Sequence, residues 1–536
     1  MTADEGPPGR VRTPFGGARS PSTFFTTRWL FLRALGLVFL IAHVSLWTQI
    51  EGLVGTQGIL PYTDYLDWIH RNLGAEAYLR FPSLAWFGGD DVVLHLLCGA
   101  GVTLSLLLIA GVAPLTTLLL LLAGYLSLMI AGGPFLSFQW DILLLESGFM
   151  SLFLAPLELR PRFPAGRSPP SIASIWLLRV LLFKLMFLSG VVKLISMDAT
   201  WWNLTALDYH YFTQPLPTWT AWYAHHLPGW IRKLSVLLMF VIEIGVPFLI
   251  FLGRRPRIVA GLLLVLLQVL IASTGNYTYF NLLTVALCIP LFDDALLRRL
   301  LPGRIRDRLA GPPPGAGAGP SAAPVRRLLV NATAALLMLL SAMTVVRECV
   351  RTRQREPIGG ITAGLLDAGQ RYLLSWGQPY LLRWTDGFHL INGYGLFRGM
   401  TTRRPELVIE VSNDGNTWRE LPFRYKVGDP GRRPRFVAPH QPRLDWQMWF
   451  AALNLRGNAQ WLDGLYIALL EGRPAVLGLL GDNPFPDGPP RWLRIAYYEY
   501  EFTTPEERAQ SGNWWTRRLL GRSRPISASD FARRRG

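Results

Sequence analysis

Cysteine is scarce in this sequence: its 536 residues include only three, Cys98, Cys288 and Cys349. Three thiols cannot form the framework of a disulfide-rich domain, and neither a CxxC pair nor a Cys/His zinc spacing is present. The sequence therefore predicts no metal centre. The scarcity of cysteine also argues against thiol–disulfide chemistry carried by this chain.

Familiar catalytic and nucleotide-binding motifs are absent as well. There is no nucleophile elbow, HExxH or Walker motif, so we expect no cofactor. The net charge of +17 comes almost entirely from arginine. Because RNP, zinc-finger and helix-turn-helix spacings are missing, we expect no nucleic-acid partner. Basic loops that face anionic membrane lipid explain the charge better.

Long apolar runs are what the sequence has in abundance. Half of the residues are hydrophobic and only 17% are charged. Nine segments approach the ~20 residues that cross a bilayer. They are 29–47, 92–110, 115–131, 138–156, 172–196, 231–252, 258–275, 276–292 and 328–346. The fold class predicted is a polytopic α-helical membrane protein with about nine transmembrane helices.

Basic residues in the short connections predict the orientation. With nine spans, the arginine-rich segments all fall on one side, which must be cytoplasmic: the N-terminal tail, 157–171, 253–257 and 293–327. The connections on the other side are acidic or nearly neutral. We therefore expect a cytoplasmic N-terminus, with residues 197–230 and everything after 346 outside.

The organisation predicted along the chain has six parts. They are a disordered basic tail (1–27), a transmembrane domain (28–300), a Pro/Gly/Ala-rich cytoplasmic linker (301–327), a last transmembrane helix (328–346), a β-rich α+β extracytoplasmic domain (347–520) and a basic tail (521–536). In the β-rich domain, ELVIEVSNDGNTWREL alternates around Asn413-Asp414-Gly415, which is typical of a hairpin. FRYKV and RWLRIAYYEYEFTT predict further strands, QMWFAALNL and AQWLDGLYIALLEG predict helices, and a sandwich is the expected core.

Residues 197–230, here called the aromatic loop, connect two of the apolar runs. Their tryptophans and tyrosines suit the membrane–water boundary, and an aromatic belt accounts for most of them. A belt does not require so many polar side chains in one segment that is stiffened by Pro215 and Pro217. The candidate binding site in this loop comprises Trp201, Trp202, Asn203, Thr205, Tyr209, His210, Gln214, His225 and His226.

Several long motifs resemble the lipase maturation factor family. They are WWNLTALDYHYFTQPLPTWTAWYAHHLP, NGYGLFRGMTTRRPELVIEVSNDGNTWRELPFRYKVGD, RRPRFVAPHQPRLDWQMWFAAL, NPFP and GNWWTR, and the resemblance extends from about residue 28 to 520. It implies a multi-pass protein of the endoplasmic reticulum membrane that helps secreted lipases to mature. The arginine- and alanine-rich tails look bacterial, which would make the plasma membrane the equivalent place. A more distant similarity to the membrane domain of vitamin K-dependent carboxylase-like proteins keeps an enzyme hypothesis open.

Charged residues inside predicted spans are costly and are usually paired or functional. Asp141, Glu146, Lys184, Lys193 and Glu243 form this group. At ~1.5 Å per helical residue, Lys184 and Glu243 lie at equal depth and predict an ion pair. The same estimate places Lys193 close to Asp141 or Glu146, below the aromatic loop. A structural ion pair is the simpler interpretation of Lys184 and Glu243.

Two candidates for chemistry remain. A lysine in a desolvated site can act as a base, so Lys193, with His210 above it, is the candidate catalytic pair. In the β-rich domain, His440, Arg443, Asp445 and Trp446 form a dense polar and aromatic group. Client contact and docking of the domain onto the membrane face explain this group equally well.

The function that the sequence supports best is a membrane-bound maturation factor that helps an exported client, such as a lipase or another hydrolase, to fold or assemble. Its expected partners are that client and membrane lipid. The alternative is a membrane-embedded enzyme that modifies an exported protein or a lipid. A transporter is less favoured because no inverted repeat is evident.

Overall fold

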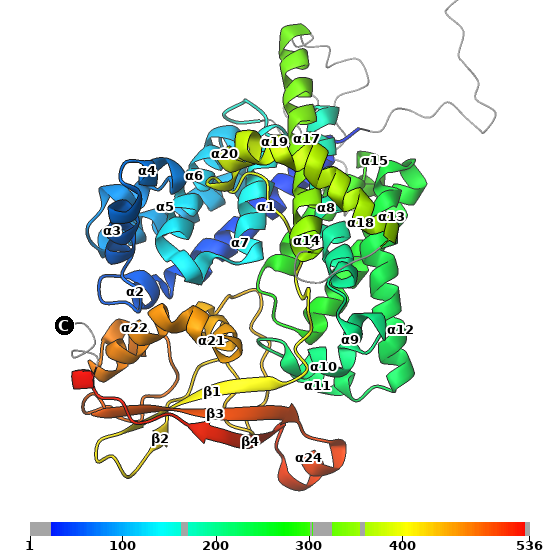
Figure 1. Cartoon of the computed structure of the whole chain (residues 1–536). Coiled ribbons are helices and arrows are strands. Elements are labelled where there is room, and N and C mark those ends of the chain that lie inside the picture. Colours follow the sequence, from blue (N-terminus) through cyan, green and yellow to red (C-terminus); the bar gives the residue numbers. More distant parts are fainter. Residues whose placement is uncertain (1–22, 162–169, 301–302, 304–323, 354–359, 531–536) are drawn as a thin grey trace, which may run out of the picture.

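Long apolar helices form the upper part of the molecule and a twisted sheet forms the lower part (Figure 1). This computed structural model describes residues 23–161, 170–300, 303, 324–353 and 360–530. The predicted N-terminal tail up to residue 22, most of the 301–327 linker and the last six residues lie outside these ranges.

Seven helices in the described residues are long and apolar enough to cross a membrane. They are α1 (Phe25–Trp47), α5 (Asp91–Ala110), α6 (Pro114–Gly132, continued by η2, Gly133–Leu136), α8 (Ile172–Ile195), α12 (Gly229–Phe240, continued by η3, Val241–Gly245, and η4, Val246–Phe251), α13 (Arg254–Thr274) and α17 (Pro324–Arg353). The polytopic helical fold is therefore confirmed.

Two further predicted spans form shorter helices. These are α7 (Gln139–Leu152) and α14 (Phe280–Cys288), which the turn η5 (Ile289–Leu291) extends. Both pack within the bundle, and α7 carries Asp141 and Glu146 with no exposed surface. Buried helices need not match the bilayer thickness as lipid-facing ones do. The count of nine spans stays a prediction.

The two ends of the bundle differ in chemistry. At one end, Asp294 in α15 (Asp294–Leu300) accepts the backbone N–H groups of Phe25 and Thr27, at 2.8 and 3.1 Å. Arg254 pairs with Asp293 at the same end. We call this the basic end, because the described arginines next to Phe25 and in residues 253–257 and 293–300 lie there. The aromatic loop and the sheet lie at the other end, the sheet end (Figure 1).

Short helices complete the bundle. Between α1 and α5 lie α2 (Ile50–Val54), α3 (Tyr62–Leu73), α4 (Glu76–Arg80) and η1 (Leu84–Phe87). After α17 come α18 (Gly360–Gly369), η6 (Gln370–Leu374), α19 (Ser375–Gly377), η7 (Gln378–Leu382) and α20 (Arg383–Asp386). This second group turns back onto α17, where Arg347 pairs with Asp386 at 2.9 Å. Residues 360–386 are thus helical, and the first strand begins only at Arg404.

One four-stranded antiparallel sheet organises the C-terminal domain (residues 404–530). Its strands are β1 (Arg404–Ser412), β2 (Arg419–Glu420), β3 (Trp492–Phe502) and β4 (Trp515–Arg522), in the order β2-β1-β3-β4. The predicted hairpin joins β1 and β2. Asp414 in its loop accepts the N–H groups of Asn416 and Thr417, which is the usual role of aspartate in a tight turn.

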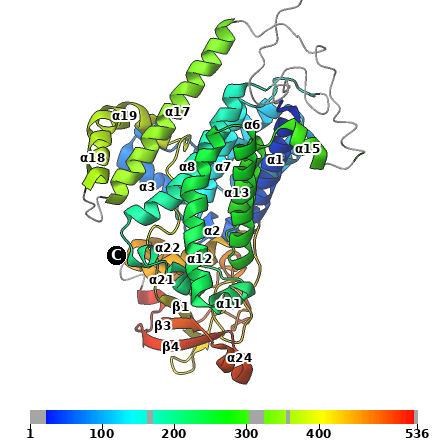
Figure 2. The same ribbon diagram turned by 90° about the vertical axis from the view of Figure 1, so that its right-hand side faces the viewer.

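The predicted sandwich is wrong: the described residues contain a single sheet in this domain. Strand alternation places Leu407, Ile409 and Val411 on one face, against α21 (Arg443–Leu453) and α22 (Ala459–Leu470). These helices lie between the sheet and the bundle in both views (Figures 1 and 2). FRYKV forms no strand, because its backbone turns away from β1 and hydrogen-bonds to Asp445.

The other face of the sheet packs on the aromatic loop. Tyr498, Tyr500 and Phe502 of β3 share one buried cluster with Phe212 and Trp222 of the loop. Each large side chain buried here contributes about 1.5–3 kcal/mol. Short helices at the periphery complete the domain: η8 (Arg456–Asn458), α23 (Pro474–Leu477) and α24 (Pro505–Ser511).

Candidate functional site

Three short helices shape the aromatic loop: α9 (Ala199–Trp202), α10 (Ala206–Thr213) and α11 (Trp219–His225). Asp198 caps α9, since its Oδ1 accepts the N–H of Thr200 at 2.8 Å. Its other oxygen, Oδ2, accepts the N–H of Met400 at 2.7 Å. One carboxylate therefore both starts the loop and holds the segment that leads into β1.

The loop is clamped between the helical bundle and the C-terminal domain. Arg404, fully buried at the start of β1, donates to the backbone carbonyls of Phe212, Gln214 and Pro215. The indole N–H of Trp449 donates to Thr213 O at 2.8 Å, and that of Trp222 to Thr503 O at 2.9 Å. The aromatic loop thus connects the helical bundle to the C-terminal domain through buried hydrogen bonds.

The predicted loop residues divide by exposure. Trp201 and Gln214 are buried, and Trp202 and Asn203 are exposed. The other five, Thr205, Tyr209, His210, His225 and His226, are half-buried. The structure brings most of these side chains into contact with protein, so few of the nine predicted residues offer exposed surface.

His210 and Gln214 meet Tyr277, which follows α13. The hydroxyl of Tyr277 lies 3.0 Å from His210 Nε2 and donates to Gln214 Oε1 at 2.8 Å. Burial and the nearby Lys193 lower the pKa of His210 to about 4. Burial also lowers the pKa of His225 to about 4, with His226 and Arg232 acting in the same direction. Both imidazoles are therefore neutral near pH 7.

The predicted intramembrane ion pairs are wrong in their partners. Lys184 pairs with Glu146 rather than Glu243, and both side chains are fully buried. Lys193 pairs with Glu243 at 2.7 Å, and its Nζ also donates to Ser189 O at 2.8 Å. All five charged side chains form ion pairs, as a structural role predicts. The two lysines have the opposite glutamates to those predicted, and Asp141 pairs with Arg443.

The error has a geometric cause. The depth estimate assumed that α8 ends and α12 begins at the same level. Lys193 is two residues from the end of α8 and Glu243 is 14 residues from the start of α12. At ~1.5 Å per residue, α12 therefore begins roughly 18 Å beyond the end of α8. Figure 2 shows α12 reaching down beside α11.

Asp141 pairs with a residue of the C-terminal domain. The Arg443 guanidinium donates to both oxygens of Asp141, at 2.9 and 3.1 Å, and to Phe135 O at 2.7 Å. The hydroxyls of Tyr125 and Tyr279 also donate to Asp141 Oδ1, at 2.5 and 2.7 Å. A bidentate arginine with tyrosine donors satisfies the carboxylate, which a buried charge requires.

The remaining members of the predicted C-terminal group lie around Arg443. Ser45 Oγ of α1 forms a hydrogen bond with His440 Nδ1 at 2.9 Å, and the rings of Trp446 and Trp140 meet in a T-shaped arrangement. Asp445 Oδ1 accepts the N–H groups of Tyr425 and Lys426, and burial raises its pKa to about 6. The contacts of His440 and Trp446 reach the helical bundle, as docking onto the membrane domain requires, whereas those of Asp445 stay within the C-terminal domain.

Glu146 provides a second attachment. Its Oε2 accepts from Asn392 N, Asn392 Nδ2 and Tyr394 OH at 2.9, 3.1 and 2.7 Å, while its Oε1 faces Lys184. Sequence reasoning missed this partner, as it missed Arg404. Strand alternation assigns Arg404 to a polar face and so to solvent, whereas the aromatic loop covers that face.

The described residues contain no group of three or more His, Cys, Asp or Glu side chains placed to hold a metal ion. Lys193, the candidate base, donates to Glu243 Oε2 and to the backbone carbonyl of Ser189. The contacts of the site residues join the C-terminal domain and its preceding segment to the helical bundle and the aromatic loop. They define a polytopic membrane protein whose C-terminal domain is attached to the helical bundle through buried polar contacts.

Comparison with known proteins identifies the family. Residues 26–299 match the lipase maturation factor transmembrane domain, and residues 390–525 match the lipase maturation factor C-terminal domain. The chain belongs to the lipase maturation factor family, and the resemblance predicted from the motifs is confirmed.

Curated relatives cover most of the chain. Lipase maturation factor 2 of Homo sapiens is 39% identical over 92% of this chain and 81% of its own length. Lipase maturation factor 1 of Bos taurus is 34% identical over 96% of this chain and 92% of its own. Lipase maturation factor 1 of Homo sapiens is 32% identical over 96% and 91%. No solved structure matches the chain significantly.

Proposed function

We propose that this protein is a membrane-bound maturation factor that helps an exported lipase or related hydrolase to fold or assemble. Membership of the lipase maturation factor family supports this function. The relatives named above carry lipase maturation in their names.

The observation that carries the proposal is the attachment of the C-terminal domain. Three buried polar contacts make this attachment. Arg443 binds Asp141 of the bundle, and Arg404 binds the aromatic loop. Glu146 of the bundle binds Tyr394 in the segment that precedes the domain. A binding platform is more effective when its parts are held rigidly, because less ordering is needed when the partner binds. We infer that the sheet end presents one preorganised surface to the client.

We further propose that this surface lies outside the cytoplasm and that the membrane is a bacterial plasma membrane. The arginine-rich connections at the basic end support this orientation through the positive-inside rule. The arginine- and alanine-rich tails support the bacterial setting.

Co-expression tests the function. The chain is expressed with an exported lipase from the same host, and secreted lipase activity is compared with the amount of lipase protein. A maturation factor raises the specific activity of the lipase, not only its quantity. Specific activity that is unchanged when the gene is deleted contradicts the proposal.

Cysteine labelling tests the orientation. Asn203→Cys lies on the aromatic loop and Gly253→Cys at the basic end, and both positions are exposed. The native cysteines are buried, so they give little background. A membrane-impermeant maleimide should label Asn203→Cys in intact cells and Gly253→Cys only after lysis. The reverse pattern contradicts the orientation.

A further inference from the structure

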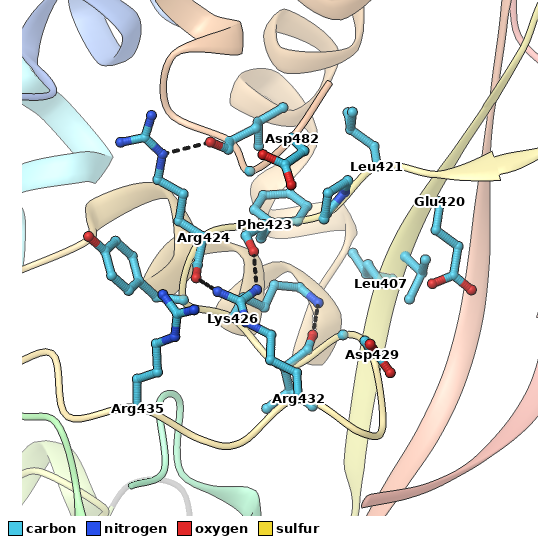
Figure 3. Close-up of a pocket in the computed structure, with 17 residues that line it drawn as sticks. Leu407, Glu420, Leu421, Phe423, Arg424, Lys426, Asp429, Arg432, Arg435 and Asp482 are labelled. Carbon is cyan, nitrogen blue, oxygen red and sulfur yellow. Dashed lines mark hydrogen bonds between the residues drawn. The ribbon is translucent and has the colours of Figure 1, made fainter. Parts of the chain in front are cut away.

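A pocket of about 550 Å³ in the C-terminal domain is lined by charges of both signs. Figure 3 shows Arg432 and Arg435 in its wall together with Asp429 and Asp482. The charge of this pocket therefore favours a ligand of neither sign. A more selective surface lies on residues 360–386, the helical segment that follows α17.

Residues 360–386, here called the crossing helix, form one continuous helical stretch from α18 to α20. The crossing helix lies across α17 in Figure 1 and beside it in Figure 2. Two glycines face α17. A Cβ atom at Gly369 would lie 2.7 Å from Val346 Cγ1, and one at Gly377 would overlap Met343 Cε. The glycines thus let the two helices approach closely, as small residues commonly do between membrane helices.

The crossing point coincides with the end of the apolar surface of α17. This helix is one of the seven candidate spans, and it meets the crossing helix at Met343 and Val346. The next residue, Arg347, pairs at 2.9 Å with Asp386, whose side chain is exposed. An exposed carboxylate belongs in water and not in hydrocarbon. The crossing helix therefore lies at the level expected for the membrane–water boundary.

Two stripes of different chemistry run along the exposed side of the crossing helix. Tyr372, Trp376 and Tyr380 form an aromatic stripe, with 71, 45 and 72% of their surfaces exposed. Arg371 and Ser375, also exposed, form a polar stripe next to it. At ~3.6 residues per α-helical turn, positions four apart drift around the axis, and the wider π-turns η6 and η7 offset this drift. Each stripe therefore stays on one side of the helix.

The aromatic stripe suits the membrane boundary better than it suits water. Tyrosine and tryptophan combine an apolar ring with a polar tip, and they gather at the level of the lipid headgroups. The indole N–H of Trp376 already donates to Tyr372 O at 2.8 Å, so the ring can enter an apolar environment without an unpaired donor. On the bilayer side of the crossing, α17 exposes Leu336 and Leu339. The aromatic stripe therefore continues the surface that a spanning α17 presents to lipid.

We propose that the crossing helix lies flat on the membrane surface, with its aromatic stripe against lipid and its polar stripe in water. An amphipathic helix in this position buries its apolar side between the headgroups and the acyl chains. Zwitterionic lipid is sufficient, because the aromatic stripe carries no charge. The sequence predicts an extracytoplasmic domain from residue 347, and the proposal places residues 360–386 at the membrane surface instead. It does not depend on the proposed function.

Spin labels on single cysteines test the proposal, with the full chain in phosphatidylcholine nanodiscs. Tyr372→Cys and Tyr380→Cys carry the label on the aromatic stripe, and Ser375→Cys is the matched control on the polar stripe. The native cysteines are buried and give little background. The measurement is the ratio of collisions with oxygen, which concentrates in the bilayer, to collisions with a water-soluble nickel chelate. We expect this ratio to be roughly 10-fold higher at the two tyrosine positions than at Ser375.

Equal ratios at the two stripes overturn the proposal, because the aromatic stripe then faces water. Few collisions with either reagent at the aromatic stripe also overturn it, because protein, such as a second copy of the chain, then covers the stripe. Each variant is first required to keep the unfolding temperature of wild type.

Lipid crosslinking tests the same contact in the wild-type chain, so it does not depend on the folding of a variant. Phosphatidylcholine with a photoreactive diazirine high in one acyl chain is incorporated into the nanodisc, and adducts are located by mass spectrometry. We expect adducts on Tyr372 or Tyr380 as well as on Leu336 and Leu339 of α17, which are the internal control. Adducts on α17 without any on residues 360–386 overturn the proposal.

Discussion

Arg443 of the C-terminal domain and Asp141 of the helical bundle are 302 residues apart in sequence and form a buried bidentate ion pair. Neither side chain has more than 1% of its surface exposed. Two tyrosine hydroxyls complete the hydrogen bonding of the carboxylate. Attachment of the C-terminal domain to the bundle therefore depends on a buried pair of opposite charges, one from each part.

Removing one partner of this pair should be costly. Arg443→Met leaves the Asp141 carboxylate buried without a cation, which costs about 3–5 kcal/mol in comparable sites. We expect a lower unfolding temperature in detergent and faster proteolysis of the C-terminal domain. Arg443→Met with Asp141→Leu should recover part of the loss, because no unpaired charge remains. Arg456→Met, at an exposed position, is the control, and an equal effect there contradicts this role.

The Glu146 attachment predicts a local effect. Glu146→Gln leaves Lys184 without its anion and weakens the acceptor for Asn392 and Tyr394. Backbone amide exchange should therefore increase around residues 390–395 more than in β1 or β3, because the strands keep their own ladder. Hydrogen exchange measured by mass spectrometry checks this. Uniform exchange across the domain would show that Glu146 does not hold this segment specifically.

Much of the fold was predictable because it follows from local patterns. The seven long helices appear where hydropathy places them, and the Asn413-Asp414-Gly415 turn joins two strands as expected. The partners of the buried charges were not predictable, because they depend on where helices begin relative to one another. Glu243 could be assigned to Lys193 only after the extension of α12 beyond α8 was known.

The candidate site was predictable in composition but not in its contacts. Arg443 and Asp445 belonged to a recognisable polar group, yet neither partner could be deduced from spacing. The sandwich prediction failed for a related reason. A sheet face needs an apolar cover, and here one face is covered by helices and the other by the aromatic loop, which lies more than 170 residues before β1.

Conservative changes at the two candidate catalytic residues distinguish a binding factor from an enzyme. Lys193→Arg keeps the positive charge opposite Glu243, and His210→Gln keeps a hydrogen-bonding group opposite Tyr277. A maturation factor should retain most of its activity with either change, within about twofold, a difference of about 0.4 kcal/mol. Specific activity of the co-expressed lipase is the measurement. Loss of more than tenfold with normal expression and an unchanged unfolding temperature would favour an enzyme.

His210 predicts a pH effect on stability with a definite sign. Its pKa in the folded protein is about 4, below the ordinary 6.5, so the unfolded chain binds a proton first as the pH falls. The contribution of neutral His210 to the free energy of unfolding is therefore complete above pH 6.5, and it is lost as the pH falls towards 4. The free energy of unfolding can change by at most ~1.4 kcal/mol per pH unit, and we expect a fraction of this because the His210 side chain is only half-buried.

Asp445 changes the free energy of unfolding in the opposite direction over this pH range, since burial raises its pKa to about 6. Its effect is the same in wild type and in a His210→Gln variant, so a comparison of the two isolates His210. The difference in unfolding temperature between wild type and His210→Gln should thus move in favour of the variant as the pH is lowered from 7.5 to 4.5. Parallel curves across this range would mean that His210 titrates as it does in water, and that its environment is more hydrated than its contacts with Tyr277 and Phe397 imply.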